Sequence, residues 1–146
     1  MIKIYLDVCC LCRPFDDQDQ DRIRLETEAI ITILKYCQRG VWTFAASKAI
    51  DYELSNIKDT DKLKDIQKAY SLAGQRLHTD GQIENRSNIL QERGFPFFDS
   101  LHLALAEAYK YDVLLTTDDG FIAVAKRNPL SVRVENPAIW LLEALK

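Results

Sequence analysis

The chain has 146 residues, which is the size of one ordinary domain. Hydrophobic residues make up 47% of it and charged residues 28%, a composition that argues against a disordered or low-complexity chain. The formal net charge is −3, which argues against non-specific nucleic-acid binding through overall charge. The apolar runs are too short for a membrane span, and an acid at position 7 leaves little room for a signal peptide. We therefore expect a single cytoplasmic domain over residues 1–146, without a membrane partner.

In the first half of the chain, apolar spacing predicts alternating strands and helices. The run Ile2 to Leu6 predicts a buried strand that ends at Asp7. Ser47 is predicted as the N-cap of a helix. Further elements are expected at residues 22–39 (helix), 41–45 (strand), 47–57 (helix) and 59–73 (helix). Residues 75–81 are polar and are predicted to form a turn.

The second half continues the same alternation. The predicted elements are helices at residues 82–92, 99–109, 118–127 and 137–145, with strands at 113–116 and 131–134. Strands that alternate with helices are typical of an α/β fold, a central parallel sheet with helices on both faces. Ligands of such sheets bind outside the carboxyl ends of the strands. Asp7 and Asp118 each follow a predicted strand, so both are expected at that edge.

Four acids are candidate site residues: Asp7, Glu53, Asp99 and Asp118. Taken singly, each has a structural interpretation, because Asp99 and Asp118 suit helix N-caps and Glu53 suits a solvated helix face. If they converge at one sheet edge, their like charges destabilise one another unless a cation is present. Carboxylate oxygens favour Mg²⁺ or Mn²⁺, and such a site activates water against a phosphodiester.

Two segments near the C-terminus carry a more specific pattern. They are Phe98-Asp99-Ser100-Leu101-His102-Leu103-Ala104 and Leu114-Leu115-Thr116-Thr117-Asp118-Asp119-Gly120-Phe121. With Ile4-Tyr5-Leu6-Asp7 at the start, Glu53 after the second predicted strand, and Val134-Glu135-Asn136-Pro137 near the end, the chain resembles the PIN-domain family of metal-dependent ribonucleases. The resemblance runs nearly from end to end.

The resemblance implies a Rossmann-like PIN fold and an endoribonuclease that hydrolyses RNA with Mg²⁺ or Mn²⁺. By position, Asp7, Glu53, Asp99 and Asp118 correspond to the catalytic acids of the family. Asp7, Asp99 and Asp118 would hold the metal, and Glu53 would be a ligand or a base that orients water. Asp119 is a less certain ligand. The family also implies a homodimer and cleavage that leaves a 3′-hydroxyl and a 5′-phosphate. Many small members are VapC-type toxins that an antitoxin protein holds inactive.

Two other interpretations stay open. Many family members carry a small polar residue, often Asn, where this chain has Cys9, which favours a catalytically weak or inactive binding or regulatory module. The spacing of Cys9 and Cys12 after a strand is also typical of a thiol redox protein. Against redox chemistry, Asp7 lies close by and would raise the pKa of a thiol, so reduced, buried cysteines are favoured.

Two further side chains have a candidate role near the acids. Arg13 is a candidate for binding the scissile phosphate, and an ordinary surface arginine is an equal alternative. His102 lies one helical turn after Asp99, where it either tunes that acid or is a helix histidine with satisfied hydrogen bonds.

Overall fold

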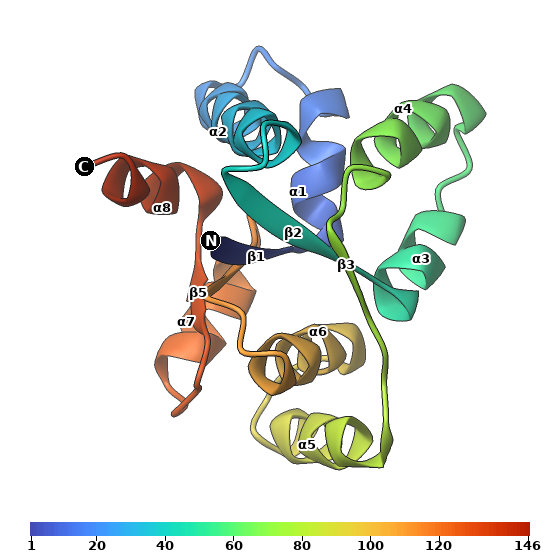
Figure 1. Cartoon of the computed structure of the whole chain (residues 1–146), viewed down its shortest axis with the longest axis vertical. Helices are drawn as coiled ribbons and strands as arrows, with labels where there is room; N and C mark the ends of the chain where they lie inside the picture. Colours follow the sequence, from blue (N-terminus) through green and yellow to red (C-terminus); the bar gives the residue numbers. More distant parts are fainter.

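The computed structural model describes residues 1–146 and places five parallel strands in one sheet. The strand order is β3-β2-β1-β4-β5, so that β1 lies at the centre (Figure 1). The strands are β1 (Ile2–Leu6), β2 (Trp42–Ser47), β3 (Gln75–Leu77), β4 (Val113–Leu115) and β5 (Arg133–Glu135). The predicted α/β fold with a central parallel sheet is confirmed.

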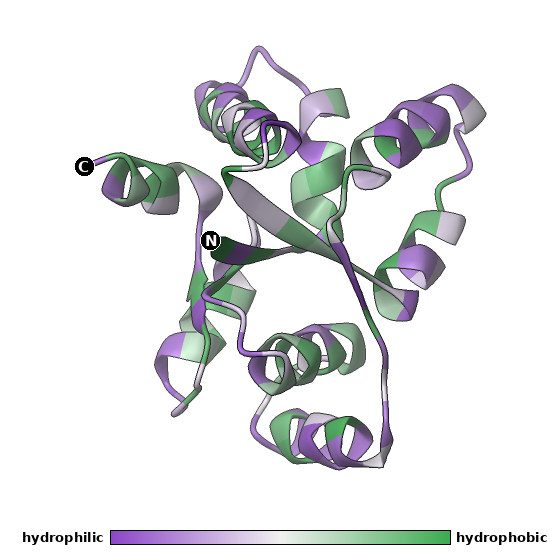
Figure 2. Ribbon diagram, viewed as in Figure 1, coloured by the Kyte–Doolittle hydropathy of each residue, from purple (hydrophilic) through white to green (hydrophobic).

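Helices cover both sides of this sheet. They are α1 (Val8–Cys12), α2 (Asp21–Gln38), α3 (Lys48–Ser55), α4 (Thr60–Tyr70), α5 (Gly81–Glu92), α6 (Phe97–Ala108), α7 (Asp119–Lys126) and α8 (Pro137–Ala144). Figure 1 shows α1, α2 and α4 on one side of the sheet and α5 and α6 on the other. In Figure 2, α6 is mostly in the hydrophobic colour, whereas α4 is largely in the hydrophilic colour. None of the helices is long and apolar enough to cross a membrane.

The position of β1 creates the edge at which a site can form. The chain passes from β1 to β2 and β3 on one side, and then to β4 and β5 on the other. Ile4 pairs with Val113 and Leu6 with Leu115, so the chain leaves β1 and β4 side by side. The backbone N–H of Asp7 extends this pairing and donates to the Leu115 carbonyl at 3.0 Å. A crevice at such a reversal of strand order is where open α/β sheets bind ligands.

Strand β3 was not predicted. Residues 75–77 were expected in a turn, but they pair with β2 in parallel. Gly74 makes this pairing possible, because a Cβ atom there would lie 2.1 Å from Oγ1 of Thr43. Its N–H donates to the carbonyl of Phe44 at 2.9 Å. The strand is a polar edge strand that buries only Leu77, so its sequence carries no hydrophobic alternation.

Helix α1 was also not predicted. It begins directly after β1, where the Asp7 side chain accepts a hydrogen bond from the N–H of Val8. A single turn that begins at the end of a strand is too short to show a helical period. Its effect is to fix the acid at the end of β1 in one orientation. The predicted N-caps Ser47 and Asp118 are confirmed, since their side chains accept from Ile50 and from Gly120 and Phe121.

Candidate active site

Asp7 is the most firmly held of the four acids. Its side chain is largely buried, at 7% exposure for the residue. One carboxylate oxygen accepts from the Val8 N–H at 2.8 Å, and the other accepts from the Thr116 hydroxyl at 2.8 Å. The Cys9 thiol donates to that second oxygen at 3.4 Å. Donors from both sides of the β1–β4 crevice therefore orient Asp7, as supporting groups orient a metal-binding carboxylate.

Glu53 reaches the same place from α3. Its Oε1 atom accepts a hydrogen bond from Nε2 of His102, which lies on α6. That nitrogen is 3.9 Å from Oδ1 of Asp7. One ligand atom each of Asp7, Glu53 and His102 fall within 4.8 Å of one another. The structure thus brings together two acids that are separated by 46 positions in the chain.

His102 belongs to a hydrogen-bond chain that runs into the core. It is fully buried, and its Nδ1 lies 2.5 Å from the hydroxyl of Tyr5, which in turn lies 2.9 Å from the hydroxyl of Ser47. Ser47 already accepts from the Ile50 N–H, so its hydroxyl is free to donate to Tyr5. Tyr5 then donates to Nδ1 and Nε2–H donates to Glu53, which satisfies a neutral imidazole.

The burial of Tyr5 supports its role as the hydrogen-bond donor to His102. Burial, with a smaller contribution from the charge of Asp7, raises the pKa of the Tyr5 hydroxyl well above 10, so Tyr5 stays a donor. The interpretation of His102 as a satisfied histidine is confirmed. Its hydrogen-bond partners are Tyr5 and Glu53, not Asp99.

Asp99 lies in the first turn of α6, and the residue that caps this helix is Pro96, without a side-chain bond. The alternative that Asp99 is a cap is therefore wrong. Burial, and then the negative charges of Asp7, Asp118 and Glu53, raise its pKa to about 7. The acids predicted from the sequence thus act on one another in the folded chain.

Asp118 stands at the exposed rim of this cluster. Its Oδ1 atom accepts from the N–H groups of Gly120 and Phe121 at 2.9 and 3.2 Å. Both bonds use one oxygen, so capping α7 and binding a cation are compatible roles for this carboxylate. Its backbone N–H donates to the Thr116 hydroxyl at 3.1 Å. Thr116 therefore links Asp7 to Asp118 across the crevice.

Asp119 and Arg13 are engaged in other ion pairs. Asp119 pairs with the guanidinium of Arg22 at 2.6 Å, and this hydrogen bond lowers the pKa of Asp119. Arg13 lies 3.0 Å from Asp16 and 3.1 Å from Glu26. A phosphate would have to compete with these two acids for Arg13, so its role as a phosphate ligand stays a prediction without geometric support.

The cysteines near the site are free thiols. The Cys9 sulfur lies 3.3 Å from the Thr116 hydroxyl and accepts from the Thr117 N–H at 3.3 Å. It therefore makes the polar contacts that a small polar side chain would make at this position. Burial raises the pKa of the Cys12 thiol, which keeps it protonated and disfavours redox chemistry with Cys9.

The donor set fits a divalent cation. Carboxylate oxygens are the ligands that Mg²⁺ and Mn²⁺ prefer, whereas both ring nitrogens of the neighbouring His102 are already hydrogen-bonded to Tyr5 and Glu53. Neither Asp99 nor Asp118 forms an ion pair with a basic side chain, so the local negative charge is not balanced by the protein. A buried acidic cluster of this kind is able to bind a metal ion, which would relieve the repulsion that raises the pKa of Asp99.

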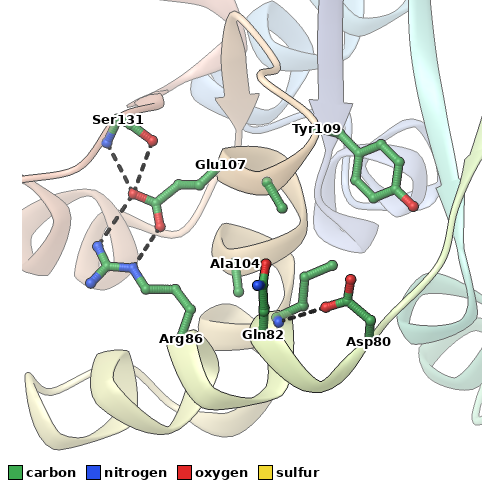
Figure 3. Close-up of a pocket in the computed structure, with 9 residues that line it drawn as sticks. Asp80, Gln82, Arg86, Ala104, Glu107, Tyr109 and Ser131 are labelled. Atoms are coloured by element: carbon green, nitrogen blue, oxygen red, sulfur yellow. Dashed lines mark hydrogen bonds and ion pairs between the residues drawn. The ribbon is translucent and has the colours of Figure 1, made fainter.

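A cavity between α5 and α6 shows a contrasting arrangement. It measures about 510 Å³ and is lined by Asp80, Arg86, Glu107 and Ser131 among others (Figure 3). Arg86 binds Glu107 through two hydrogen bonds, and Glu107 also accepts from the N–H and hydroxyl of Ser131. Every charge in this group has a partner, so the group ties residue 131 to α6 and needs no ligand.

Comparisons with known proteins support the fold. No protein-family model matches the sequence, and no curated protein matches it. The architecture is PIN-like: a five-stranded, all-parallel sheet flanked by helices. At 15–17% sequence identity, the similarity reported below shows the fold alone.

Three solved structures share this architecture, each with a TM-score of 0.59. FitAcB from Neisseria gonorrhoeae is 15% identical, and the match covers 92% of this chain and 97% of that chain. VapBC2 from Rickettsia felis, in a structure bound to a DNA fragment from its promoter, is 17% identical. The match covers 92% of this chain and 98% of that chain. PAE2754 from Pyrobaculum aerophilum is 16% identical, and the match covers 99% of this chain and 98% of that chain.

Proposed function

We propose that this chain is a divalent-metal-dependent endoribonuclease. The observation that carries the proposal is the convergence of Asp7 and Glu53 where the strand order reverses, with Asp99 and Asp118 close enough for their charges to interact with these acids. No lysine or arginine pairs with Asp7, Glu53, Asp99 or Asp118, and His102 is their one basic neighbour, so a cation would offset their negative charge. The similarity of the fold to the structure named VapBC2 adds support, since the sequence resembles VapC-type ribonucleases.

The four acids have two different roles in the proposed hydrolysis, metal binding and activation of water. Asp7, Asp99 and Asp118 would hold Mg²⁺ or Mn²⁺, which supplies a positive charge that polarises the phosphodiester and acidifies water. Asp7 is pre-oriented for this by Val8 and Thr116. Glu53, fixed through one oxygen by His102, orients the attacking water and accepts its proton. The water oxygen bonds to phosphorus, the bond to the 3′-oxygen breaks, and that oxygen takes up a proton, which leaves a 3′-hydroxyl and a 5′-phosphate.

A cleavage assay on single-stranded RNA with Mn²⁺ tests the proposal. We expect the double variant Asp7→Asn, Asp99→Asn to lose activity by about 100-fold or more, because it removes two charges that hold the cation. Asp119→Asn is the matched control, because this neighbouring acid pairs with Arg22 and should leave cleavage intact. Equal cleavage by the wild type and the double variant would refute the assignment. No cleavage by the pure wild type would favour the binding or regulatory module.

We also propose that the chain is the toxin of a toxin–antitoxin pair. The similarity of the fold to FitAcB and VapBC2 supplies the support for this, together with the sequence resemblance to VapC-type toxins. A homodimer and a cytoplasmic location belong to the same proposal, and four free cysteines fit a reducing compartment. Co-expression with the product of a small upstream reading frame checks it. An antitoxin should co-purify with the chain and suppress RNA cleavage.

A further inference from the structure

An aromatic groove lies beside the acidic cluster, between α3 and α6. It encloses about 480 Å³, and its lining includes Lys48, Tyr52, Phe97 and Phe98. Tyr52 is 58% exposed and Phe97 is 54% exposed. They are the two most exposed aromatic side chains of the chain, ahead of Phe15 at 41%, whereas large aromatic side chains more often pack against the core.

The rings have the geometry of a stacking surface. Tyr52 of α3 and Phe98 of α6 are stacked, with centroids 5.4 Å apart and planes 17° apart. Phe97 meets Phe98 edge-on at 5.1 Å and 81°. The half-buried Phe98 thus holds two exposed rings in fixed orientations, which lowers the entropy cost of stacking a further flat ring on them.

The groove and the acids are built from the same two helices. Tyr52 directly precedes Glu53 on α3, and Phe98 directly precedes Asp99 on α6. Neighbouring residues on a helix point about 100° apart, so each helix presents an acid on one face and an aromatic ring on the adjacent face. A substrate whose phosphate lies against the acids therefore has its neighbouring groups beside Tyr52 and Phe98.

We propose that this groove is a nucleobase subsite, in which an unpaired base next to the scissile phosphate stacks on Tyr52 and Phe97. Lys48, which lines the groove, binds a flanking phosphate. The inference rests on the proposed nuclease function and assigns its substrate contacts. Stacking needs an exposed base face, so the subsite selects single-stranded over base-paired RNA, and it tolerates any base because every base has a flat face.

The lining favours a nucleotide over a second copy of the chain. A nucleotide needs a flat apolar surface and a cation for its phosphate, and the groove offers both, with rings that directly precede Glu53 and Asp99 in the chain. A neighbouring cavity of about 280 Å³ shares Thr79, Phe97 and Leu101 with it and adds the polar residues Glu84, Ser87 and Asn88. The surface therefore continues past the rings, as a strand of several nucleotides requires.

Binding of a fluorescent single-stranded RNA oligonucleotide tests the proposal. The measurement uses the full-length chain in the Asp99→Asn background, so that cleavage does not interfere. Tyr52→Ala and Phe97→Ala should each weaken binding about tenfold, and Tyr52→Phe should restore it because the ring is kept. Leu142→Ala, at an equally exposed apolar position on α8, is the matched control and should bind like the parent.

A second oligonucleotide separates stacking from other effects. An oligonucleotide without bases should bind the parent and Tyr52→Ala variants equally, because the stacking partner is gone. Unchanged affinity of both alanine variants for ordinary RNA would overturn the subsite. So would a change from dimer to monomer in Tyr52→Ala without loss of RNA affinity, since a second copy of the chain would then cover the groove.

The two proposals fail in different ways. If the wild type cleaves RNA with Mn²⁺ and Tyr52→Ala keeps the wild-type KM, the nuclease stands and the subsite is refuted. If RNA binding depends on Tyr52 and Phe97 but no metal supports cleavage, the subsite stands and the nuclease is refuted.

Discussion

Two carboxylates in this molecule, those of Glu26 and Asp7, are both buried, and they differ in what surrounds them. Glu26, whose side chain is 2% exposed, contacts Arg13 and Arg22 at 3.1 Å each and accepts from the Asn136 amide at 2.6 Å. Asp7, at the carboxyl end of β1, accepts from hydroxyl, thiol and backbone donors, lies close to Glu53, and contributes to the raised pKa of Asp99. Two arginines neutralise the charge of Glu26, whereas no lysine or arginine neutralises the charge of Asp7.

The difference separates structural acids from functional ones. A buried charge is tolerated when opposite charges and hydrogen bonds surround it, and the Glu26 cluster meets this condition. Like charges at one place cost stability unless something outside the chain compensates them. The acidic cluster is therefore expected to respond to added cations, whereas the Glu26 cluster, which already has its counter-charges, is not.

The largest effect is expected from breaking the neutralised cluster. Glu26→Ala leaves two guanidinium groups without their shared acid and should lower the free energy of unfolding by about 3 kcal/mol. Chemical denaturation measures this directly. The control is Glu143→Ala, which removes an exposed partner of Arg133 and should have little effect. A loss for Glu26→Ala no larger than that of the control would mean that the buried cluster does not stabilise the fold.

An intermediate effect is expected from adding a cation. A ligand that binds only the folded chain at 100 times its dissociation constant stabilises it by about 2.7 kcal/mol. Mn²⁺ should therefore raise the unfolding temperature of the wild type and of Glu26→Ala, but not that of the Asp7→Asn, Asp99→Asn double variant. Thermal unfolding with Mn²⁺ and with EDTA makes the comparison. An equal increase in the double variant would place the cation elsewhere.

The smallest effect concerns pH in the absence of metal. Because the pKa of Asp99 is raised from 3.8 to about 7, the unfolded chain ionises this group before the folded chain does. The wild type in EDTA should lose stability as the pH rises from about 4 to about 7, and Asp99→Asn should not share this loss. Above pH 7, the variant should be the more stable by about 1 kcal/mol, a value reduced for the partial exposure of the carboxyl group. If the free energy of unfolding of the two proteins changed with pH in the same way, Asp99 would not have the raised pKa that the neighbouring acids are expected to cause.

Much of the fold could be predicted because the buried strands are short, apolar and separated by amphipathic helices. Strand β1 and the helix that begins after Ser47 follow directly from that pattern. Strand β3 could not be predicted, since its pairing depends on the contact of Gly74 with Thr43, two residues that are far apart in the chain. Helix α1 was missed because one turn has no period to detect.

The site was predicted in part. The sequence pattern singled out the four acids, but the sheet register decides which of them meet, and only the folded chain shows that Glu53 is held by His102. The hydrogen-bond chain from Ser47 through Tyr5 to His102 was not predicted, because Tyr5 reads as a core residue of β1. An inward-facing hydroxyl beside a buried histidine is the signal that could have found it.

The central place of β1 in the sheet has a consequence for how the protein is made. Asp7 is synthesised 109 residues before Thr116, whose hydroxyl orients it. Strand β4 and the acid that caps α7 also come long after β1 in the chain. During translation Asp7 therefore stays without a site around it until the chain has been extended through β4 and the start of α7.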